Sequence, residues 1–519
     1  MQTNDIKDDA IFSVVGVCGI NGNLIARILA DHSYTVRAND LADEDTCRFK
    51  NSLKDYPQIK VYHGEVPESF FEDTDYFILP KALIDNNSQL YQKVLKHNIE
   101  ILTVEDIFRL FEPTHPVICI TGTNGKTTTT NLLKHIVRLS GFNPCEHNLD
   151  GMQGNAGDIP ALQSRLNGDV NILETGTFGY KGSLTKLAKD CHPDVGIITN
   201  ITPDHLNEDS SFLDYARVKG ELIELLENKM LIVNGDDPVI MGLIDKLGYN
   251  GEVISFGVDY NTGNVSDKTC VCGRSTRIQE SISGVGIYEC SCGIKYSKPD
   301  YLACNINQTH DTFTLRTPTD EFYQFHLGIT GIHNIYNSIP TIIVANKVLG
   351  ISFEDIQTNI TTFTGVSGRM EKITSINGKD VMVDYAHNPA GIETVLKELK
   401  HAYSKVINVI TTSSESGLQG DEEILNCACK YADIVIPASK NSYECSKLTI
   451  QNGNFTDKIV LPDSMPEGHK DGTLGATLNQ VLAGFNKAIT LDADLIVCTG
   501  EAAFKYKDDL VRCKISSKK

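Results

Sequence analysis

Residues 117–136, VICITGTNGKTTTTNLLKHI, are the stretch that most constrains what this chain can fold into. The apolar start predicts a buried strand, the glycines predict a tight turn, and the segment after them predicts a helix. Backbone N–H groups and the helix dipole converge on such a turn and form an anion-binding site. The usual phosphate-binding loop reads G-x-x-x-x-G-K-[ST], but here Ile120 stands at its first glycine, and the nearest upstream glycine is Gly122.

The turn supplies candidate ligands for a nucleotide and for Mg²⁺. Lys126 would reach the β- and γ-phosphates, and Thr127 would offer its hydroxyl to Mg²⁺. A capped helix with a solvated lysine is the alternative, which the order strand, glycine, lysine and threonine argues against. The other candidates for ATP binding in this turn are Gly122, Thr123, Asn124, Gly125 and Thr128.

Composition bounds the class of protein. The 519 residues predict about three domains. A net charge of −20 argues against nucleic-acid partners, and no apolar run reaches the roughly 20 residues that a membrane-spanning helix needs. The acidic N-terminus lacks the pattern of a signal peptide, so we expect a cytoplasmic protein. Single cysteines in apolar stretches, such as Cys18, Cys119 and Cys498, are interpreted as reduced, buried thiols.

Strand and helix patterns alternate along the whole chain, which predicts an α/β fold with parallel sheets. Two prolines in FEPTHP, residues 111–116, indicate a boundary before the phosphate-loop strand. A second boundary is expected near Gly365, where a new series of strands begins. We therefore predict three domains, at 1–112, 113–364 and 365–519.

The first predicted domain opens with a strand, three glycines at 16, 19 and 22, and a helix. A second strand ends at Asp40, eighteen residues after Gly22. This pattern is typical of a Rossmann-like first turn, in which Gly19, Gly22 and Asp40 would bind a nucleotide-linked substrate. The spacing is G-x-x-G-x-x-G rather than G-x-G-x-x-G, so tight packing of strand and helix alone is the alternative.

Further candidate ligands follow two later strands. Glu174 ends the strand in NILETGTFG, and TNITPDHLNEDSSFLDYARVKGELIE places Lys219 fourteen residues after His205. A carboxylate and an imidazole at strand ends near a phosphate loop could hold Mg²⁺ between the protein and the phosphates. Taken singly, Glu174 could be a surface acid, His205 a structural residue and Lys219 a solvated helix residue.

Several of these stretches, in this order, resemble the Mur ligase superfamily. TGTNGKTTT is similar to its loop, in which T-G-T-N-G-K-T replaces the usual first glycine. The D-H-L and Y-x-x-x-K pattern, the segment GIHNIYN, and the stretches SGRMEKI and VMVDYAHNPAGIETVLKEL are also similar to the family. The resemblance covers residues 113 to about 400.

The resemblance implies an ATP-dependent ligase that activates a carboxylate as an acyl-phosphate and joins it to an amine. It implies Lys126, Glu174, His205 and Lys219 as the catalytic set. Thr127, Glu174, His205 and a carbamoylated Lys219 would serve as Mg²⁺ ligands.

The same resemblance implies where the rest of ATP would bind. His333 and Asn334 would lie near the adenine, although Asn334 and Asn337 could instead cap a helix. Arg369 would meet phosphate or ribose, and Asp384 would bind the ribose hydroxyls.

Four cysteines form two C-x-C-G knuckles, with seventeen residues between them. Four thiolates at two turns can enclose a tetrahedral Zn²⁺, so we predict a zinc-ribbon insertion at about 265–305. Free thiols or a disulfide are the alternatives, and Cys304 could replace one ligand. The predicted zinc ligands are Cys270, Cys272, Cys290 and Cys292.

Three domains plus a ribbon most resemble the archaeal pseudomurein peptide ligases. The expected reaction is addition of an amino acid to a UDP-linked sugar-peptide precursor, of murein or pseudomurein type. Alternatives are an amidotransferase synthetase subunit fed by a glutaminase partner, a folylpolyglutamate synthase-like ligase, and a non-catalytic nucleotide-binding protein. The sequence does not define the acceptor or the oligomeric state, and a monomer is among the states that it allows.

Overall fold

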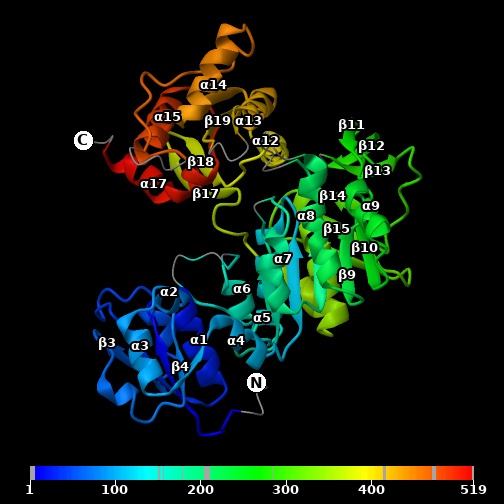
Figure 1. The fold of residues 1–519 in the computed structure, drawn as a ribbon. Coiled ribbons are helices and arrows are strands. Elements are labelled where there is room, and N and C mark those ends of the chain that lie inside the picture. The colour runs from blue at the N-terminus through cyan, green and yellow to red at the C-terminus, as the bar shows by residue number, and fades with distance from the viewer. Residues whose placement is uncertain are drawn as a thin grey trace.

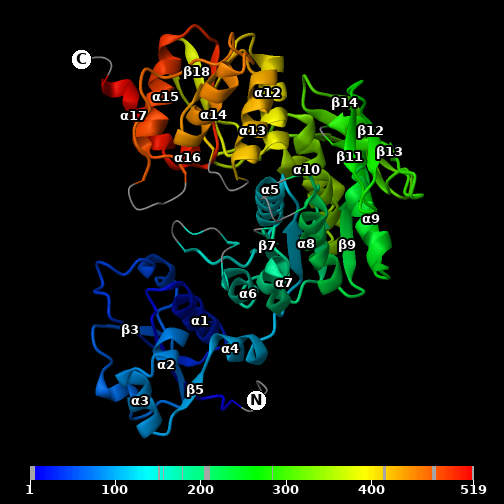
Figure 2. The same cartoon turned by 45° about the horizontal axis from the view of Figure 1, so that its top comes forward.

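The computed structural model describes residues 6–149, 152, 154–155, 157–177, 179–203, 211–282, 284–412, 417–469 and 475–516. Within these residues the strands form four sheets, and helices pack on the three larger ones, which confirms the predicted α/β class. Figures 1 and 2 show three bodies, with the central one, cyan to green, between the blue N-terminal body and the orange-to-red C-terminal body.

The N-terminal body is built on a five-stranded sheet with the order β3-β2-β1-β4-β5, in which all described pairs are parallel. Its strands are β1 (Ile11–Val15), β2 (Thr35–Asp40), β3 (Ile59–His63), β4 (Tyr76–Ile78) and β5 (Glu100–Leu102). Its helices are α1 (Ile20–Asp31), α2 (Lys81–Asp85), α3 (Gln89–Lys96) and α4 (Val104–Leu110), with short 3₁₀ turns η2 (Lys50–Leu53) and η3 (Glu68–Phe70).

The central body carries an eight-stranded sheet with the order β16-β15-β14-β10-β9-β8-β6-β7. Strands β6 (Val117–Thr121), β7 (Asn171–Glu174), β8 (Val195–Ile198), β9 (Met230–Asn234), β10 (Glu252–Val258) and β14 (Tyr301–Asn307) pair in parallel, while β15 (Thr312–Arg316) and β16 (Phe322–His326) are antiparallel additions. Every residue of β6 and β8 is buried, as expected for parallel strands covered on both faces.

Helices cover this sheet and deliver the residues of the candidate site. They are α5 (Lys126–Leu139), α6 (Ile159–Gln163), α7 (Ser183–Ala188), α8 (Phe212–Leu225), α9 (Pro238–Leu247), α10 (Ile332–Ile343) and α11 (Phe353–Ile360), with a 3₁₀ turn η4 (Lys189–Cys191) and a π-helical turn η5 (Val344–Val348) that extends α10. Between β10 and β14 the chain forms a separate antiparallel sheet of β11 (Val265–Thr269), β12 (Ser275–Ile282) and β13 (Val285–Glu289).

The C-terminal body has a five-stranded sheet with the order β17-β18-β21-β19-β20, in which only the pairing of β17 with β18 is antiparallel among the described strands. The strands are β17 (Glu371–Ile376), β18 (Lys379–Asp384), β19 (Val406–Ile410), β20 (Ile434–Pro437) and β21 (Leu495–Thr499). The helices are α12 (Pro389–Ala402), α13 (Gly417–Tyr431), α14 (Lys440–Gln451), α15 (Leu478–Thr490), α16 (Glu501–Lys505) and α17 (Lys507–Ser516).

Helix α1 joins the N-terminal body to the central one. The Arg27 guanidinium donates to the carbonyls of Glu146 (2.9 Å) and His147, and Asn21 donates to Asp158 at 2.7 Å. One continuous cluster of buried apolar side chains also runs through both bodies. The contact therefore combines apolar burial with hydrogen bonds to loop carbonyls. No helix of the described residues combines the length and the apolar character that crossing a membrane requires.

One cysteine differs from the sequence-based expectation. Cys18 is not a free thiol, because it forms a disulfide with Cys47, whose Cα atom lies 5.0 Å away. Parallel neighbours β1 and β2 end at the same edge of the sheet, so the segments that follow them meet there. Cys119 and Cys498 are buried free thiols, as expected.

The turn between β1 and α1 leaves no room for a side chain at Gly22. A Cβ atom there would lie 2.3 Å from the carbonyl oxygen of Gly16. We predict that Gly22→Ala lowers the free energy of unfolding by about 1–3 kcal/mol, although alanine is the better helix former. Urea unfolding followed by circular dichroism measures the change.

Gly468→Ala is the matched control, since the nearest atom to its Cβ lies 3.9 Å away. Equal stability of the two variants would contradict the close packing of this turn.

Candidate functional site

The turn after β6 is packed so closely that two of its positions require glycine. Gly122 has a φ of +142°, and a Cβ atom there would lie 2.0 Å from Thr199 Oγ1. Gly125 has a φ of +85°, and its Cβ would lie 2.1 Å from Asn337 Oδ1. The close approaches fall at these two positions and not at Ile120, which is a buried residue of β6. This accounts for the displaced glycine of the motif.

Hydrogen bonds anchor the turn to the segment that follows β8. The carbonyl of Asn124 accepts from Thr199 Oγ1 at 2.6 Å and from Asn200 Nδ2 at 2.9 Å. In return, Asn200 accepts from the backbone N–H groups of Thr123 (2.8 Å) and Asn124 (3.1 Å). The Thr123 hydroxyl lies 3.1 Å from the hydroxyl of Tyr215 on α8. The loop is thus preorganised by its neighbours on two sides.

Helix α5 starts directly from this turn. Gly125 occupies the N-cap position, so no side chain caps the first N–H groups of the helix. The Lys126 ammonium folds back over the turn and donates to the carbonyls of Gly122 (3.0 Å) and Thr123 (2.8 Å). A backbone turn, an uncapped helix start and a lysine come together here, which are the parts that bind phosphate.

A cavity of about 330 Å³ opens beside the turn, between the central and C-terminal bodies. It brings together residues that are far apart in the sequence: the phosphate-loop turn, the end of β8, α10, the segment 364–370 and α12. Six of the predicted ATP-binding residues line it, namely Asn124, Gly125, Thr128, Asn334, Arg369 and Asp384. Gly122, Thr123, Lys126 and Thr127 belong to the adjoining turn and the start of α5.

Helix α10 presents a set of fixed polar groups to this cavity. Asn334 donates to the carbonyl of Thr330 at 2.6 Å and accepts from Asn337 Nδ2 at 3.1 Å. Burial lowers the pKa of His333 to about 4, so its ring is neutral at pH 7. The buried His333 Nδ1 atom makes no hydrogen bond within the described part of the chain. His333 lines the cavity, and this nitrogen atom lies without a hydrogen-bond partner beneath the cavity surface.

Asp384, at the end of β18, lies in the part of the cavity wall that the C-terminal body contributes. Its two oxygens accept from the backbone N–H groups of Met370 (2.8 Å) and Ala386 (2.7 Å). Burial raises the pKa of this carboxyl, while the charge of Arg369 opposes the shift. The Arg369 guanidinium lies 5.0 Å from the centre of the Tyr385 ring. Asp384 therefore fixes the segment that carries Arg369 toward the cavity.

A direct contact links the C-terminal body to the phosphate loop. Asn388 caps α12 by accepting from the Gly391 N–H at 2.8 Å, and its Nδ2 atom donates to Asn124 Oδ1 at 3.3 Å. The cavity is therefore bounded by two sheets whose relative position this contact helps to set.

Two of the remaining predicted ligands, Glu174 and Lys219, lie in the described part of the central body. Glu174 ends β7, opposite Ile120 of β6, and accepts from Asn155 Nδ2 at 3.4 Å. Lys219 is only 1% exposed, which excludes the solvated-helix interpretation, and its Nζ atom lies 5.2 Å from the centre of the Tyr215 ring. Since Tyr215 contacts the loop, Lys219 points toward the same region. His205 lies outside the described residues.

The N-terminal glycine turn is held by Asp40. One oxygen of this carboxylate accepts from the Cys18 N–H and the other from the Ala42 N–H, both at 2.9 Å. Packing thus accounts for Asp40 and Gly22, which was the alternative that the sequence left open. Nucleotide binding by Gly19, Gly22 and Asp40 stays a prediction.

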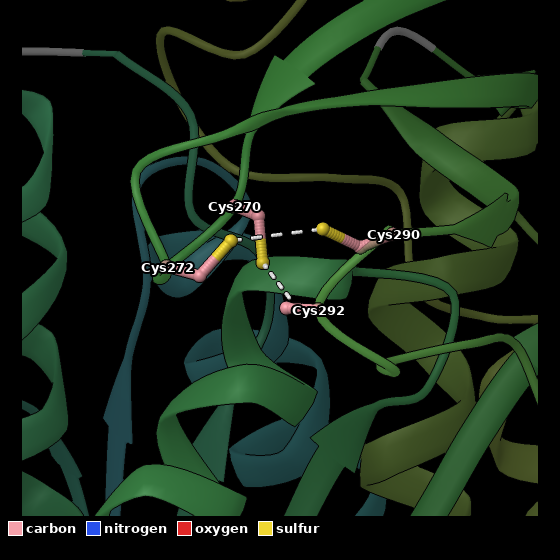
Figure 3. A group of neighbouring side chains, drawn as sticks. All are labelled: Cys270, Cys272, Cys290 and Cys292. Atoms are coloured by element: carbon pink, nitrogen blue, oxygen red, sulfur yellow. Dashed lines mark hydrogen bonds between the residues drawn. The ribbon is translucent and has the colours of Figure 1, made fainter.

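The four predicted cysteines come together from two turns of the three-stranded sheet, one between β11 and β12 and one after β13 (Figure 3). All four sulfur atoms lie within 4.8 Å of one another, and the Cys270–Cys292 and Cys272–Cys290 pairs are 3.8 and 3.7 Å apart. Zinc thiolates about 2.3 Å from the metal would lie about 3.8 Å apart in a regular tetrahedron. The donor set and its spacing therefore fit Zn²⁺. Cys304 instead contacts the carbonyl of Thr314 and is not part of the cluster.

Comparison with known proteins identifies the family. The Mur ligase middle domain matches residues 120–345, and the Mur ligase glutamate ligase domain matches residues 368–456. A pseudomurein peptide ligase type C from Methanothermus fervidus is 33% identical, with 97% of this chain and 99% of that chain covered and a TM-score of 0.84. The chain belongs to the Mur ligase family.

Two ligases named for UDP-N-acetylmuramate substrates match this Mur ligase at lower identity. The UDP-N-acetylmuramate–L-alanine ligase of Aquifex aeolicus is 26% identical over 76% of this chain and 75% of its own length. The UDP-N-acetylmuramoylalanine–D-glutamate ligase of Caldanaerobacter subterraneus subsp. tengcongensis is 26% identical over 89% of this chain and 90% of its own length.

The sequence patterns did not predict every residue that lines the cavity of this Mur ligase. Thr199 and Asn200 directly follow the buried strand β8, and polar residues at the end of a parallel strand were the available signal. Ile282 and Val285, which come from the inserted sheet, gave no such signal, because apolar residues in a strand indicate core.

The cysteine cluster generates a metal prediction. Protein purified without chelators should hold about one zinc per chain, because a preformed four-thiolate site binds this metal tightly. Elemental analysis of the wild-type protein and of the Cys272→Ser and Cys304→Ser variants tests it.

Only Cys272→Ser is expected to lose the metal, because Cys304 lies outside the cluster. A folded wild-type protein that contains no zinc would contradict the assignment.

Proposed function

We propose that this Mur ligase is an ATP-dependent ligase that joins an amino acid to a carboxylate of a UDP-linked cell-wall precursor. The observation that supports this function most strongly is the cavity in which the phosphate-loop turn, the fixed amides of α10 and the Arg369–Asp384 segment meet. Such a cavity offers a polar end for phosphates beside a neutral wall for a base and a sugar.

Lys126 and the start of α5 would bind the phosphates of ATP. Lys126 already lies over the turn through two carbonyl contacts, so a short movement of its side chain would bring the ammonium onto a phosphate oxygen. Thr127, in the first turn of α5, would offer its hydroxyl to Mg²⁺. Backbone N–H groups at the uncapped helix start would stabilise the charge that develops on the transferred phosphoryl group.

Glu174, His205 and Lys219 complete the proposed Mg²⁺ ligands. The carboxylate of Glu174 ends the strand next to the phosphate-loop strand, and carboxylate oxygen is a donor that Mg²⁺ prefers. Reaction of the buried Lys219 with CO₂ would replace a cation by an anionic oxygen donor. Bound Mg²⁺ supplies charge neutralisation between the phosphate oxygens.

The reaction follows from these parts. A substrate carboxylate held beside the γ-phosphate attacks it, forms an acyl-phosphate and releases ADP. The amino group of the incoming amino acid then attacks the acyl carbon and displaces phosphate, which leaves an amide. The chain needs no nucleophile of its own for this chemistry, because orientation and electrostatic stabilisation suffice.

The three bodies suggest a division of labour. We assign the UDP-linked precursor to residues 1–112, ATP and a structural Zn²⁺ to 113–364, and closure over ATP to 365–519. The pseudomurein ligase at 33% identity favours a pseudomurein precursor over a murein one. We place the enzyme in the cytoplasm.

Phosphate release with ATP and Mg²⁺ tests the function directly. UDP-linked sugar-peptides of both types are screened against single amino acids and against ammonia. Release that requires one precursor and one amino acid supports the ligase. Release only with ammonia, or only after a glutaminase is added, would instead indicate the amidotransferase subunit.

Lys126 provides a mutational test of the phosphate site. Lys126→Ala should lower the rate of phosphate release at least about 100-fold, the typical effect of removing one donor to a developing charge. Lys186→Ala, an exposed lysine on α7, is the control and should keep the wild-type rate. Unchanged release by Lys126→Ala would show that the turn is not the phosphate site.

Carbamoylation of Lys219 has a spectroscopic test. Protein equilibrated with ¹³C-bicarbonate should show one slowly exchanging carbamate carbon resonance by NMR. The Lys219→Arg variant keeps a cation at this position but should lack the resonance. A wild-type spectrum identical to that of Lys219→Arg would refute the modification.

A further inference from the structure

The inserted sheet reaches the cavity with the end opposite its cysteines. Strands β12 and β13 form a hairpin, which we call the cysteine hairpin, and Ile282 pairs with Val285 at its tip. The knuckles with Cys270 and Cys290 lie at the other end, next to Ser275 and beyond Glu289.

Buried hydrogen bonds fix the tip of the cysteine hairpin to the central sheet. The Lys268 ammonium, from β11, donates to the carbonyl of Gly284 at 3.0 Å and to Asp237 at 2.8 Å. Lys268 and Asp237 are 5% and 0% exposed, so this ion pair is shielded from water. The Gly286 N–H donates to the Asp236 carbonyl at 2.9 Å. These bonds join the tip to the segment after β9 and to β11, which ends directly before Cys270.

At this place the tip forms part of the cavity wall. Ile282 and Val285 line the cavity with Thr394 and Val395 of α12, and Tyr336 of α10 lies in the same wall. Tyr336 donates to Asp236 at 2.6 Å, the residue whose carbonyl binds the hairpin tip.

The lining of the cavity combines polar and apolar surfaces. The phosphate-loop turn offers N–H groups and a lysine beside Gly125, whereas Ile282 and Val285 offer aliphatic surface. A triphosphate bound to the polar turn leaves the flat, uncharged base for an apolar part of the wall.

We propose that Ile282 and Val285 form the base-contacting wall of the nucleotide cavity and that the four-cysteine cluster, at the other end of the hairpin, holds this wall in position. The insertion is then a specificity element of the site and not a remote stabilising module. This inference rests on the proposed binding of ATP in the cavity.

Calorimetric titration with a non-hydrolysable ATP analogue and, separately, with tripolyphosphate, both with Mg²⁺, tests the inference. Ile282→Ser and the nearly isosteric Val285→Thr should bind the ATP analogue about tenfold more weakly than the wild type. Both should bind tripolyphosphate with the wild-type affinity, because the phosphate-loop turn is unchanged. Cys272→Ser should show the same selective loss.

Ile287→Ser is the matched control, since this hairpin residue is 51% exposed and lies outside the cavity. Wild-type affinity of Ile282→Ser and Val285→Thr for the ATP analogue, or equal losses for both ligands, would overturn the inference. Selective loss in these two but not in Cys272→Ser would overturn the role of the cysteine cluster. Failure of the wild type to bind either ligand would refute ATP binding itself.

Discussion

The candidate site depends on one constraint: the turn after β6 packs closely against the segment after β8 and against helix α10. A side chain at Gly122 would collide with Thr199, and one at Gly125 would collide with Asn337. Both glycines have positive φ values, so the turn needs glycine for its backbone conformation as well as for space. Because the segment after β8 and helix α10 contact the turn from two sides, the start of α5 faces the cavity in a fixed orientation.

The cavity is a shared property of several bodies of the chain. The C-terminal body contributes Arg369, Asp384 and α12, and the inserted sheet contributes Ile282 and Val285. In the described structure, a polar contact between Asn388 and Asn124 joins the C-terminal body to the phosphate-loop turn of the central body. Interfaces of this kind permit relative motion of domains, so a nucleotide that contacts both sides would stabilise their closed arrangement.

Local sequence patterns predicted the parts of the site that depend on backbone chemistry. The order strand, glycine, lysine and threonine correctly predicted the turn and the start of α5, and the paired C-x-C knuckles correctly predicted that four thiols come together. Long-range contacts were not predictable in the same way. The disulfide of Cys18 with Cys47 depends on which strands are neighbours. Likewise, the hairpin tip reaches the cavity through the tertiary position of β11–β13, which no local pattern encodes.

Hydrogen–deuterium exchange with and without an ATP analogue and Mg²⁺ tests most directly whether one nucleotide binds between these bodies. We expect slower exchange in three separate segments at once: the turn and start of α5, residues 329–337, and residues 384–395, all of which contribute to the cavity or adjoin it. Protection confined to the phosphate-loop turn, with unchanged exchange in 384–395, would contradict a nucleotide site shared by the central and C-terminal bodies.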